Sequence, residues 1–491
     1  MMIKKYVFFL LIFAFFMTGC ASITPRQVPQ PFDRPRACEE FFERLDEKVK
    51  EAGVRDGSSA PVSGFPYLRT SRFLSALKER LKDDREREEW VGWMLDLNLQ
   101  AREKEIGNLH EGALSSLFSD REGLLSRMKT CSEELFTHDR TRAHFYSSLE
   151  PEAVVKDEYS FLLRTVGLYP LLVLPVSVVA ENARRKMRNR FEIDLKDLPI
   201  DGTLRVYVPE KRIPLPEKEI AEILEASQRN SLKIPRLDEG QAKRLAEYFA
   251  PVFIQDVAAP YDRFGQMVWK NHRAEVNPDK PVVYYYFSNG FLKGEPILQI
   301  NYVIWYSERA GENPPWIEKG HLDGLTIRLS LDSRGTLFMV DVQNNCGCYH
   351  FFIPDKERVD RVLSRPLMFD ALILQWLPGV SPDDRLGIRI NSGWHQPQRL
   401  LALREIPDSV PYELMPYDLL ESLPHEDGRK ESLFDENGIA KGTERVERFI
   451  LFSMGIPSIG SMRQRGRHGI ELIGRVHFDD PYLFDKNFIF K

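Results

Sequence analysis

The chain has 491 residues, of which 43% are hydrophobic, and this is enough apolar material for a large core and for two or more structural units. Lysine and arginine together number 68 and aspartate and glutamate 73, so the formal net charge is -5 at pH 7. The two signs are interspersed along most of the chain, which gives no basic face for a nucleic-acid backbone. We therefore expect a globular protein that does not bind nucleic acid.

The first twenty residues have the pattern of a targeting segment. Two lysines at positions 4 and 5 precede an apolar run over residues 6–17, which is too short to span a bilayer comfortably, and Phe-Met-Thr-Gly-Cys stands at residues 16–20. This combination resembles the signal peptide of bacterial lipoproteins, although Met17 stands where leucine is usual. The resemblance implies cleavage before Cys20, acylation of that cysteine and, with Ala21 next, sorting to the outer membrane of a Gram-negative cell. The alternative is an ordinary secretory signal with an incidental cysteine.

A tether and a helical region are expected next. Residues 20–37 are rich in proline, which favours an extended tether between the membrane and the folded body. Residues 38–150 show hydrophobic residues at three- and four-residue spacing, as over residues 124–135, and are predicted to be helical. In the oxidising cell envelope, Cys38 and Cys131 form either a disulfide or a pair of buried free thiols, and both alternatives stay open.

The connector over residues 151–235 contains an apolar stretch at residues 167–180 and a basic cluster at residues 184–190. One interpretation is a segment that lies in a membrane interface, with the basic cluster against anionic lipid headgroups. However, Pro170 and Pro175 would break a spanning helix, and short apolar runs of this kind are more often internal. We therefore expect a buried connector between subdomains.

The remaining residues, 236–491, are predicted to form an α+β domain. Asp238, followed by Gln241 three residues later, begins a helix that ends near residue 249. Residues 282–287 and 296–306 are β-branched and aromatic, as is typical of strands, and the short connections favour an antiparallel meander. The predicted fold class is thus α+β, with a helical N-terminal region followed by a mainly antiparallel β-sheet domain with peripheral helices.

A β-hairpin is predicted after these strands, because two segments of alternating apolar and polar residues flank the turn sequence Asp-Ser-Arg-Gly at residues 332–335. In the register that follows from this turn, Ile327 faces Val340 and His321 faces Cys346. One face of the hairpin is apolar and turns polar at the open end. The other face is predicted to be an ordinary solvated surface, and it carries Thr326, Arg328, Ser330, Asp341 and Gln343.

The open end of the hairpin gathers the most reactive side chains of the chain. The candidate metal-binding or catalytic residues are His321, Asp323, Cys346, Cys348 and His350, with Asn344 as a possible accessory residue and Asp341 outside the cluster. The first interpretation is a metal site, since thiolate and imidazole ligands suit Zn or Cu. The second is a cysteine activated by a histidine, as a nucleophile or redox pair. The third is a polar sheet end that is satisfied internally.

Two further sites are considered downstream. His395 would be a further accessory residue of the cluster if its loop folded over the open end of the hairpin, and it would otherwise pack beside Trp394. Arg463, Arg465 and Arg467 flank a glycine and form a candidate anion-binding site, with a solvated loop as the alternative.

These observations predict a cell-envelope protein that is attached to the membrane through lipid on Cys20 and carries a candidate metal or thiol site. The alternative is a structural or binding lipoprotein without catalytic chemistry. The sequence contains no nucleotide-binding loop, Gly-x-Ser-x-Gly elbow or His-Glu-x-x-His motif that would assign an enzyme class. Neither a substrate nor a protein partner is indicated.

Overall fold

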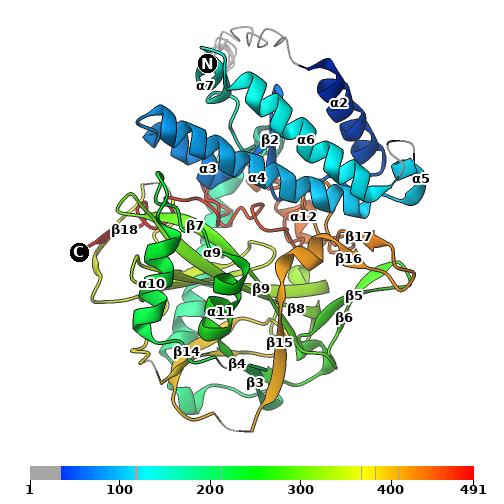
Figure 1. Cartoon of the computed structure of the whole chain (residues 1–491). Coiled ribbons are helices and arrows are strands. Elements are labelled where there is room, and N and C mark those ends of the chain that lie inside the picture. Colours follow the sequence, from blue (N-terminus) through cyan, green and yellow to red (C-terminus); the bar gives the residue numbers. More distant parts are fainter. Residues whose placement is uncertain are drawn as a thin grey trace, which may run out of the picture.

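The computed structural model describes residues 35–491 except residues 116, 118, 119, 212, 367, 382 and 407. The lipobox and Cys20 lie outside the described residues. The described chain has two parts that pack together: a mainly helical part, drawn in blue and cyan at the top of Figure 1, and a large sheet with flanking helices below it. The α+β fold class is therefore confirmed.

The N-terminal part is helical apart from one β-hairpin that the sequence periodicity did not predict. The side chains of Ser71, Asp83 and Asp120 each accept a hydrogen bond from a main-chain N–H in the first turn of a helix, and these caps fix where the helices begin. Buried apolar side chains of this part form one core. Its elements are α2 (Arg36–Glu51), β1 (Ala60–Val62), β2 (Phe65–Thr70), α3 (Arg72–Leu77), η1 (Lys78–Arg80), α4 (Asp84–Asn108), α5 (Glu111–Ser115), α6 (Arg121–Asp139) and α7 (Phe145–Leu149).

A disulfide joins two of these helices. Cys38 on α2 and Cys131 on α6 are bonded, with 5.1 Å between their Cα atoms, and both are fully buried. The packing of α2 against α6 brings together two cysteines that are 93 residues apart in sequence. Closing so long a loop favours the folded state by restricting the unfolded chain.

A ten-stranded sheet forms the centre of the second part. The strands predicted over residues 282–287 and 296–306 and in the hairpin are present, and they continue into one more strand as an antiparallel meander. In order across the sheet, the strands are β11 (His350–Pro354), β10 (Leu337–Asn344), β9 (Gly320–Leu331), β8 (Glu295–Arg309), β7 (Val282–Leu292), β15 (Val410–Pro416), β3 (Thr203–Pro209), β4 (Val252–Val257), β13 (Arg385–Ile390) and β14 (Pro397–Leu403).

The sheet is mixed, so the expectation of a mainly antiparallel sheet is only partly right. β15 runs parallel to both of its neighbours, β7 and β3, and β13 runs parallel to β4, while the other neighbouring pairs are antiparallel. Parallel neighbours need a long crossover instead of a tight turn. Because β15 returns to the middle of the sheet long after β7 in the chain, no short-range sequence pattern indicates its place.

Helices cover one face of the sheet. α9 (Tyr169–Glu192), α10 (Glu217–Ser227) and α11 (Glu239–Phe249) contribute buried side chains to the main hydrophobic core. α11 begins with the predicted capping box, in which the Asp238 carboxylate accepts from the Gln241 N–H and the Gln241 side chain accepts from the Asp238 N–H. This face is therefore the core side of the sheet.

The hairpin is present, but its register differs from the prediction by two residues. Val340 pairs with Leu329 and not with Ile327. One residue of the difference arises at the turn, where Leu331 pairs with Leu337, and the other at a bulge between Leu337 and Met339. Beyond the bulge, a difference of two residues leaves side chains on their predicted faces, whereas Phe338, at the bulge, packs against Phe484 of the C-terminal segment. Ile327, Leu329 and Val340 accordingly lie together in the main core, as expected.

The opposite face of the hairpin is not solvated, and this prediction was wrong. Its five predicted surface residues, from Thr326 to Gln343, are each at most 2% exposed. Nε and Nη2 of Arg328 donate to the two carboxylate oxygens of Asp341, and the ring of Phe478, from the C-terminal segment, lies 3.7 Å from the guanidinium. The C-terminal segment covers this face, so the sheet carries polar side chains in its interior.

Short elements complete the fold. β5 pairs with β6, β12 with β18 and β16 with β17, each in an antiparallel arrangement. The elements are α8 (Phe161–Val166), η2 (Leu195–Asp197), η3 (Pro260–Asp262), β5 (Gln266–Lys270), β6 (Arg273–Asn277), η4 (Trp316–Glu318), β12 (Val359–Val362), η5 (Tyr417–Glu421), β16 (Leu423–Pro424), β17 (Lys430–Glu431), α12 (Glu447–Ile450), η6 (Phe452–Met454) and β18 (Phe488–Phe490).

The expectation of a buried connector at residues 167–180 was also wrong. Residues 167 and 168 follow α8, residues 169–180 form the first half of α9, and Pro175 lies inside α9 without ending it. Between Phe161 and Val179, nine large hydrophobic side chains are 41–74% exposed. None of the helices in the described part of the chain combines the length and the apolar composition that crossing a bilayer requires.

Candidate functional site

The structure distributes the five candidate residues of the hairpin end over separate environments. The pairing of β9 with β10 ends at Leu325 and Asn344, so His321 and Cys346 are not the cross-strand neighbours that were predicted. Nε2 of His321 lies 2.8 Å from the carbonyl oxygen of Ala274 on β6, and burial lowers the pKa of this histidine. The candidate cluster therefore does not form as one site.

His350 lies on the other face of the sheet. Its Nε2 is 2.9 Å from Oδ2 of Asp341, which contradicts the expectation that Asp341 stands apart from the candidate residues. Burial lowers the pKa of His350, and the neighbouring Asp341 carboxylate only partly opposes this. Because His321 and His350 have these other partners, neither is the activating base that was predicted for a cysteine.

The described residues contain one group of at least three His, Cys, Asp or Glu whose ligand atoms lie within 4.8 Å of one another, and it consists of Cys38, Cys131 and Glu134. The sulfur atoms of both cysteines are bonded in the disulfide, so they are not free thiolates for a metal. The Zn or Cu site predicted at the hairpin end has no converging set of ligands among the described residues.

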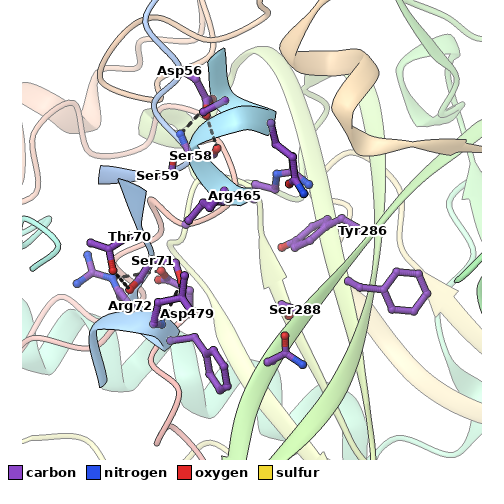
Figure 2. Close-up of a pocket in the computed structure, with 18 of the residues that line it drawn as sticks. Asp56, Ser58, Ser59, Thr70, Ser71, Arg72, Tyr286, Ser288, Arg465 and Asp479 are labelled. Carbon is purple, nitrogen blue, oxygen red and sulfur yellow. Dashed lines mark hydrogen bonds and ion pairs between the residues drawn. The ribbon is translucent and has the colours of Figure 1, made fainter. Parts of the chain in front are cut away.

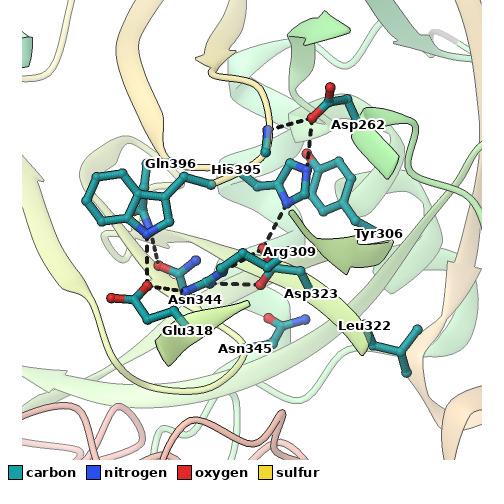
Figure 3. Close-up of polar contacts among 12 residues, drawn as sticks. Asp262, Tyr306, Arg309, Glu318, Leu322, Asp323, Asn344, Asn345, His395 and Gln396 are labelled. Atoms are coloured by element: carbon teal, nitrogen blue, oxygen red, sulfur yellow. Dashed lines mark hydrogen bonds and ion pairs between the residues drawn. The ribbon is translucent and has the colours of Figure 1, made fainter. Parts of the chain in front are cut away.

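His395 is the centre of a buried polar network, shown in Figure 3. Its loop lies between β13 and β14 and folds over the open end of the hairpin, which is the first of the two predicted alternatives. Nδ1 lies 2.8 Å from Oδ2 of Asp323, Nε2 lies 3.2 Å from Oδ1 of Asp262, and the ring stacks on Tyr306 with 3.8 Å between centroids. The main chain of His395 has a φ of 53°, which non-glycine residues rarely adopt. These contacts hold it there.

The charges of this network balance when His395 is protonated. Nε and Nη2 of Arg309 donate to Asp323 at 2.9 and 2.8 Å, and its Nη1 donates to Glu318. A second arginine lies 3.8 Å from Asp323. Burial alone would lower the pKa of His395, but hydrogen bonds to Asp262 and Asp323 raise it above its ordinary value. The network then contains three negative groups and three positive ones: Asp262, Glu318, Asp323, Arg309, Arg445 and His395.

We assign a structural role to the network around His395. His395, Asp323 and Arg309 are 0% exposed, and none of them lines the cavity described below. Tyr306 pairs directly with Asp323 across β8 and β9, on the same face as the apolar core, so the core face does turn polar at the open end as predicted. Asn344, the possible accessory residue, accepts a hydrogen bond at its Oδ1 from Nε2 of Gln396 at 2.9 Å. The network fixes the loop to the sheet.

Cys346 and Cys348 are the free cysteines of the described residues; Cys346 is buried and Cys348 is half-buried. Burial raises the pKa of Cys346, but the neighbouring Cys348 thiol and the positive charges of Arg309 and Arg445 outweigh it and lower the pKa. The neighbouring Cys346, together with burial, raises the pKa of Cys348. Sγ of Cys348 lies 3.9 Å from Oε1 of Glu447, whose pKa burial raises to about 8. This pair keeps the capacity for thiol chemistry.

The three arginines of the candidate anion site have internal partners. Arg465 forms ion pairs with two carboxylates, Arg467 with one, and Arg463 donates to two main-chain carbonyl oxygens. These contacts occupy the guanidinium groups that an external anion would need. Two of the arginines, Arg465 and Arg467, instead line a cavity. The carboxylate partners are Asp418, Glu421 and Glu158.

A cavity of about 980 Å³ lies between the helical part and the sheet, as Figure 2 shows. Its floor is the covered polar face of the sheet: Tyr286, Asn301 and Arg328 pair directly across β7, β8 and β9, so their side chains share that face. Its walls come from α4, from the segments on either side of the β1–β2 hairpin and from the C-terminal segment. No local motif could predict a site built from segments so distant in the chain.

Two carboxyl groups in the cavity wall have opposite pKa shifts. Burial raises the pKa of Asp479, and its ion pair with Arg72, at 3.2 Å, only partly opposes this. Burial alone would also raise the pKa of Asp56, but the charges of Lys104 and Arg69 outweigh burial and lower this pKa. The cavity thus holds one carboxyl that accepts hydrogen bonds as an anion and one that protonates more readily and can donate.

Several buried polar atoms at the cavity have no hydrogen-bond partner among the described residues. They include Oδ1 of Asn301, Nε1 of Trp93 and Oδ1 of Asp479. Asn301 is 0% exposed, and its Nδ2 donates to Oγ of Ser288 at 2.9 Å. An unpaired buried polar group costs about 1–3 kcal/mol, so these atoms mark a polar region beside the cavity whose hydrogen bonding the protein itself does not complete.

No protein-family model, curated protein or solved structure matches this chain. Function is therefore inferred from the site itself.

Proposed function

We propose that the protein is a lipid-anchored component of the cell envelope whose cavity binds a polar ligand rich in hydroxyl and amide groups, such as an oligosaccharide. The observation that carries the proposal is the polar floor of the cavity of about 980 Å³. Packing alone favours apolar side chains in the middle of a covered sheet face, because each buried polar group needs a partner. Ligand binding therefore explains a polar floor under a large cavity better than packing does.

The lining selects the class of ligand. Eight lysines and arginines and six aspartates and glutamates line the cavity, and several of them pair with each other, so a highly charged polymer is not favoured. Asn289, Gln299 and Asn301 offer amide donors and acceptors, while Trp93 and Tyr286 offer flat aromatic surfaces. A sugar ring presents hydroxyl groups at its edge and C–H groups on its face, and it matches both features.

Ligand binding can be measured by titration calorimetry of the full chain in detergent against a panel of soluble oligosaccharides that includes fragments of cell-wall glycan. We expect Tyr286→Ala to weaken binding about tenfold, since an aromatic contact contributes about 0.5–1.5 kcal/mol. Tyr146→Ala is the matched control, because Tyr146 is also partly buried but does not line the cavity. Binding that is unchanged in Tyr286→Ala would place the ligand elsewhere, and a panel without any binder would reject the ligand class.

The lipid anchor is tested separately by Cys20→Ser, which removes the proposed acylation site. We expect most of the variant to leave a membrane fraction that is washed at high salt, because the acyl chains supply the durable part of the attachment. Cys348→Ser, which leaves the lipobox intact, is the control. Cys20→Ser protein that stays in the washed membranes at the wild-type level would rule out the anchor as the main attachment.

Thiol redox chemistry at Cys346 and Cys348 is a second candidate function, and it is favoured by two free thiols two residues apart, with the pKa of Cys346 lowered beside Cys348 and two arginines. Together the thiols would lose two protons and two electrons to form a disulfide, and a disulfide of a partner protein would accept them and become two thiols. Iodoacetamide labelling as a function of pH is the test. We expect Cys346 to react at a lower pH than an ordinary thiol, whose pKa is about 8.5, and Cys348→Ala to raise the pH that Cys346 requires. Ordinary reactivity of both thiols would remove this candidate.

A further inference from the structure

α8 and the first half of α9 form an unusual exposed surface. The described residues contain nineteen large hydrophobic side chains that are well exposed, and nine of these lie between Phe161 and Val179. Single exposed hydrophobic side chains are normal, but a concentration of this kind marks an interaction surface. The six most exposed of these nine, each at 67–74%, are Phe161, Leu162, Val166, Leu171, Leu174 and Val179.

This surface is a rigid part of the molecule. The guanidinium group of Arg164 on α8 donates to the carbonyl oxygens of Met454 and Gly474. The main-chain N–H of Ser160 donates to the carbonyl oxygen of Gly455 at 2.7 Å. At its other end, α9 is held by Met187 and Phe191, which are buried in the main core. The two helices therefore present their apolar side chains from a fixed position.

The outward side of α9 changes from apolar to basic along its length. Leu171, Leu174 and Val178 are exposed at helical spacing, and Arg185 and Lys186 are exposed about two turns further on. One acidic residue in between, Glu181, forms ion pairs with Arg184 and Arg188. The same side of one helix thus offers hydrocarbon contacts first and exposed positive charge next.

We propose that the exposed surface of α8 and α9 docks on an anionic lipid bilayer, with the apolar side chains in the headgroup–acyl boundary and Arg185 and Lys186 at the lipid headgroups. An apolar helix face followed by a basic cluster is the arrangement of helices that lie in the plane of a membrane surface. The helix is not one that spans a bilayer. A protein partner would match the apolar part, but the adjoining basic cluster is explained by anionic lipid. The inference depends on neither the cavity nor the anchor at Cys20.

Depth-dependent fluorescence quenching tests the proposal. The full chain is placed in vesicles of phosphatidylethanolamine and phosphatidylglycerol, with or without bromine on the acyl chains, and the emission of wild-type protein is subtracted. We expect the extra emission of Leu174→Trp to fall by about half or more in brominated vesicles. Leu419→Trp, at another exposed position, is the control and should not be quenched. Since the two variants share any N-terminal anchor, a difference between them reports on the α8–α9 surface itself.

The basic cluster is tested in the same assay. Arg185→Glu with Lys186→Glu, added to Leu174→Trp, should reduce the quenching, and so should vesicles without phosphatidylglycerol. Equal emission of Leu174→Trp in brominated and plain vesicles would overturn the proposal. So would a dimer, seen by sedimentation velocity without lipid, that Leu174→Glu dissociates, because a second copy of the chain would then be the occupant of this surface.

Discussion

Strands β8 and β9 carry polar groups in the protein interior on both of their faces, and the two groups differ in how completely they are satisfied. On the core face, His395, Asp323 and Arg309 pair with each other and with further charges of the network. On the opposite face, Asn301 and Arg328 form the floor of the cavity, and Oδ1 of Asn301 has no partner among the described residues. The three central side chains of the network, His395, Asp323 and Arg309, are paired at every polar atom and support the fold, although Arg445, Asn344 and Gln396 at its edge each keep an unpaired atom. On the floor the unpaired atom of Asn301 lies beside a cavity instead.

The largest expected effect is on the paired side. Asp323→Ala leaves Arg309 and His395 as buried positive charges without their shared partner, and removal of one member of a buried ion pair typically costs about 3–5 kcal/mol. We expect a loss of this size in the free energy of unfolding, measured by urea denaturation. Asp360→Ala, at an exposed position, is the control. A loss below about 1 kcal/mol would mean that the network is not a main source of stability.

A smaller effect is expected from pH. The pKa of His395 is raised in the folded protein, so its contribution to stability is complete below the unfolded pKa of about 6.5 and is lost as pH rises through the folded value. His395→Gln should therefore show a weaker fall in stability on the alkaline side than the wild type, in urea denaturation at several pH values. Glu447 also has a raised pKa, but it is present in both proteins and cancels in the comparison. Parallel stability curves would show that His395 is not protonated in the fold.

The smallest expected effect on stability is at the cavity floor. Asn301→Leu removes the hydrogen bond to Ser288 but also the unpaired Oδ1, so the free energy of unfolding should change by no more than about 1 kcal/mol. Binding of the oligosaccharide should weaken at least about tenfold, since the ligand loses a polar partner. Calorimetry and urea denaturation on the same protein separate the two quantities. A large loss of stability with intact binding would reverse the roles assigned to the two faces.

The sequence predicted those features that depend on neighbouring residues. The capping box at Asp238 and Gln241 was confirmed, because its two hydrogen bonds join residues three apart. The faces of the hairpin were assigned correctly beyond the bulge between Leu337 and Met339, and Ile327 lies in the core. The register was wrong by two residues, because alternation alone does not distinguish two registers that differ by two residues. The sequence left undecided whether Cys38 and Cys131 form a disulfide, since it does not give the distance between them.

The candidate site was predicted least well. His395 was identified, and its loop does fold over the hairpin end, but its partner Asp262 lies far away in sequence and had no recognisable pattern. The buried state of Arg328 and the exposed state of Leu174 were both predicted the wrong way round. The hydrophobicity of a residue indicates which environment it favours, but its exposure in the folded protein depends on which other segments cover it.

The sequence by itself determined the fold class, the capped helix and the alternation that separates the two faces of the hairpin, because these features follow from local hydrogen bonding and side-chain period. Only the tertiary structure decided that β15 lies between β3 and β7, that the C-terminal segment covers the polar face of the hairpin, and that α8 and α9 expose apolar side chains. Each of these depends on contacts between segments far apart in the chain. Such contacts are favoured by the total surface that they bury, and no short stretch of residues encodes that quantity.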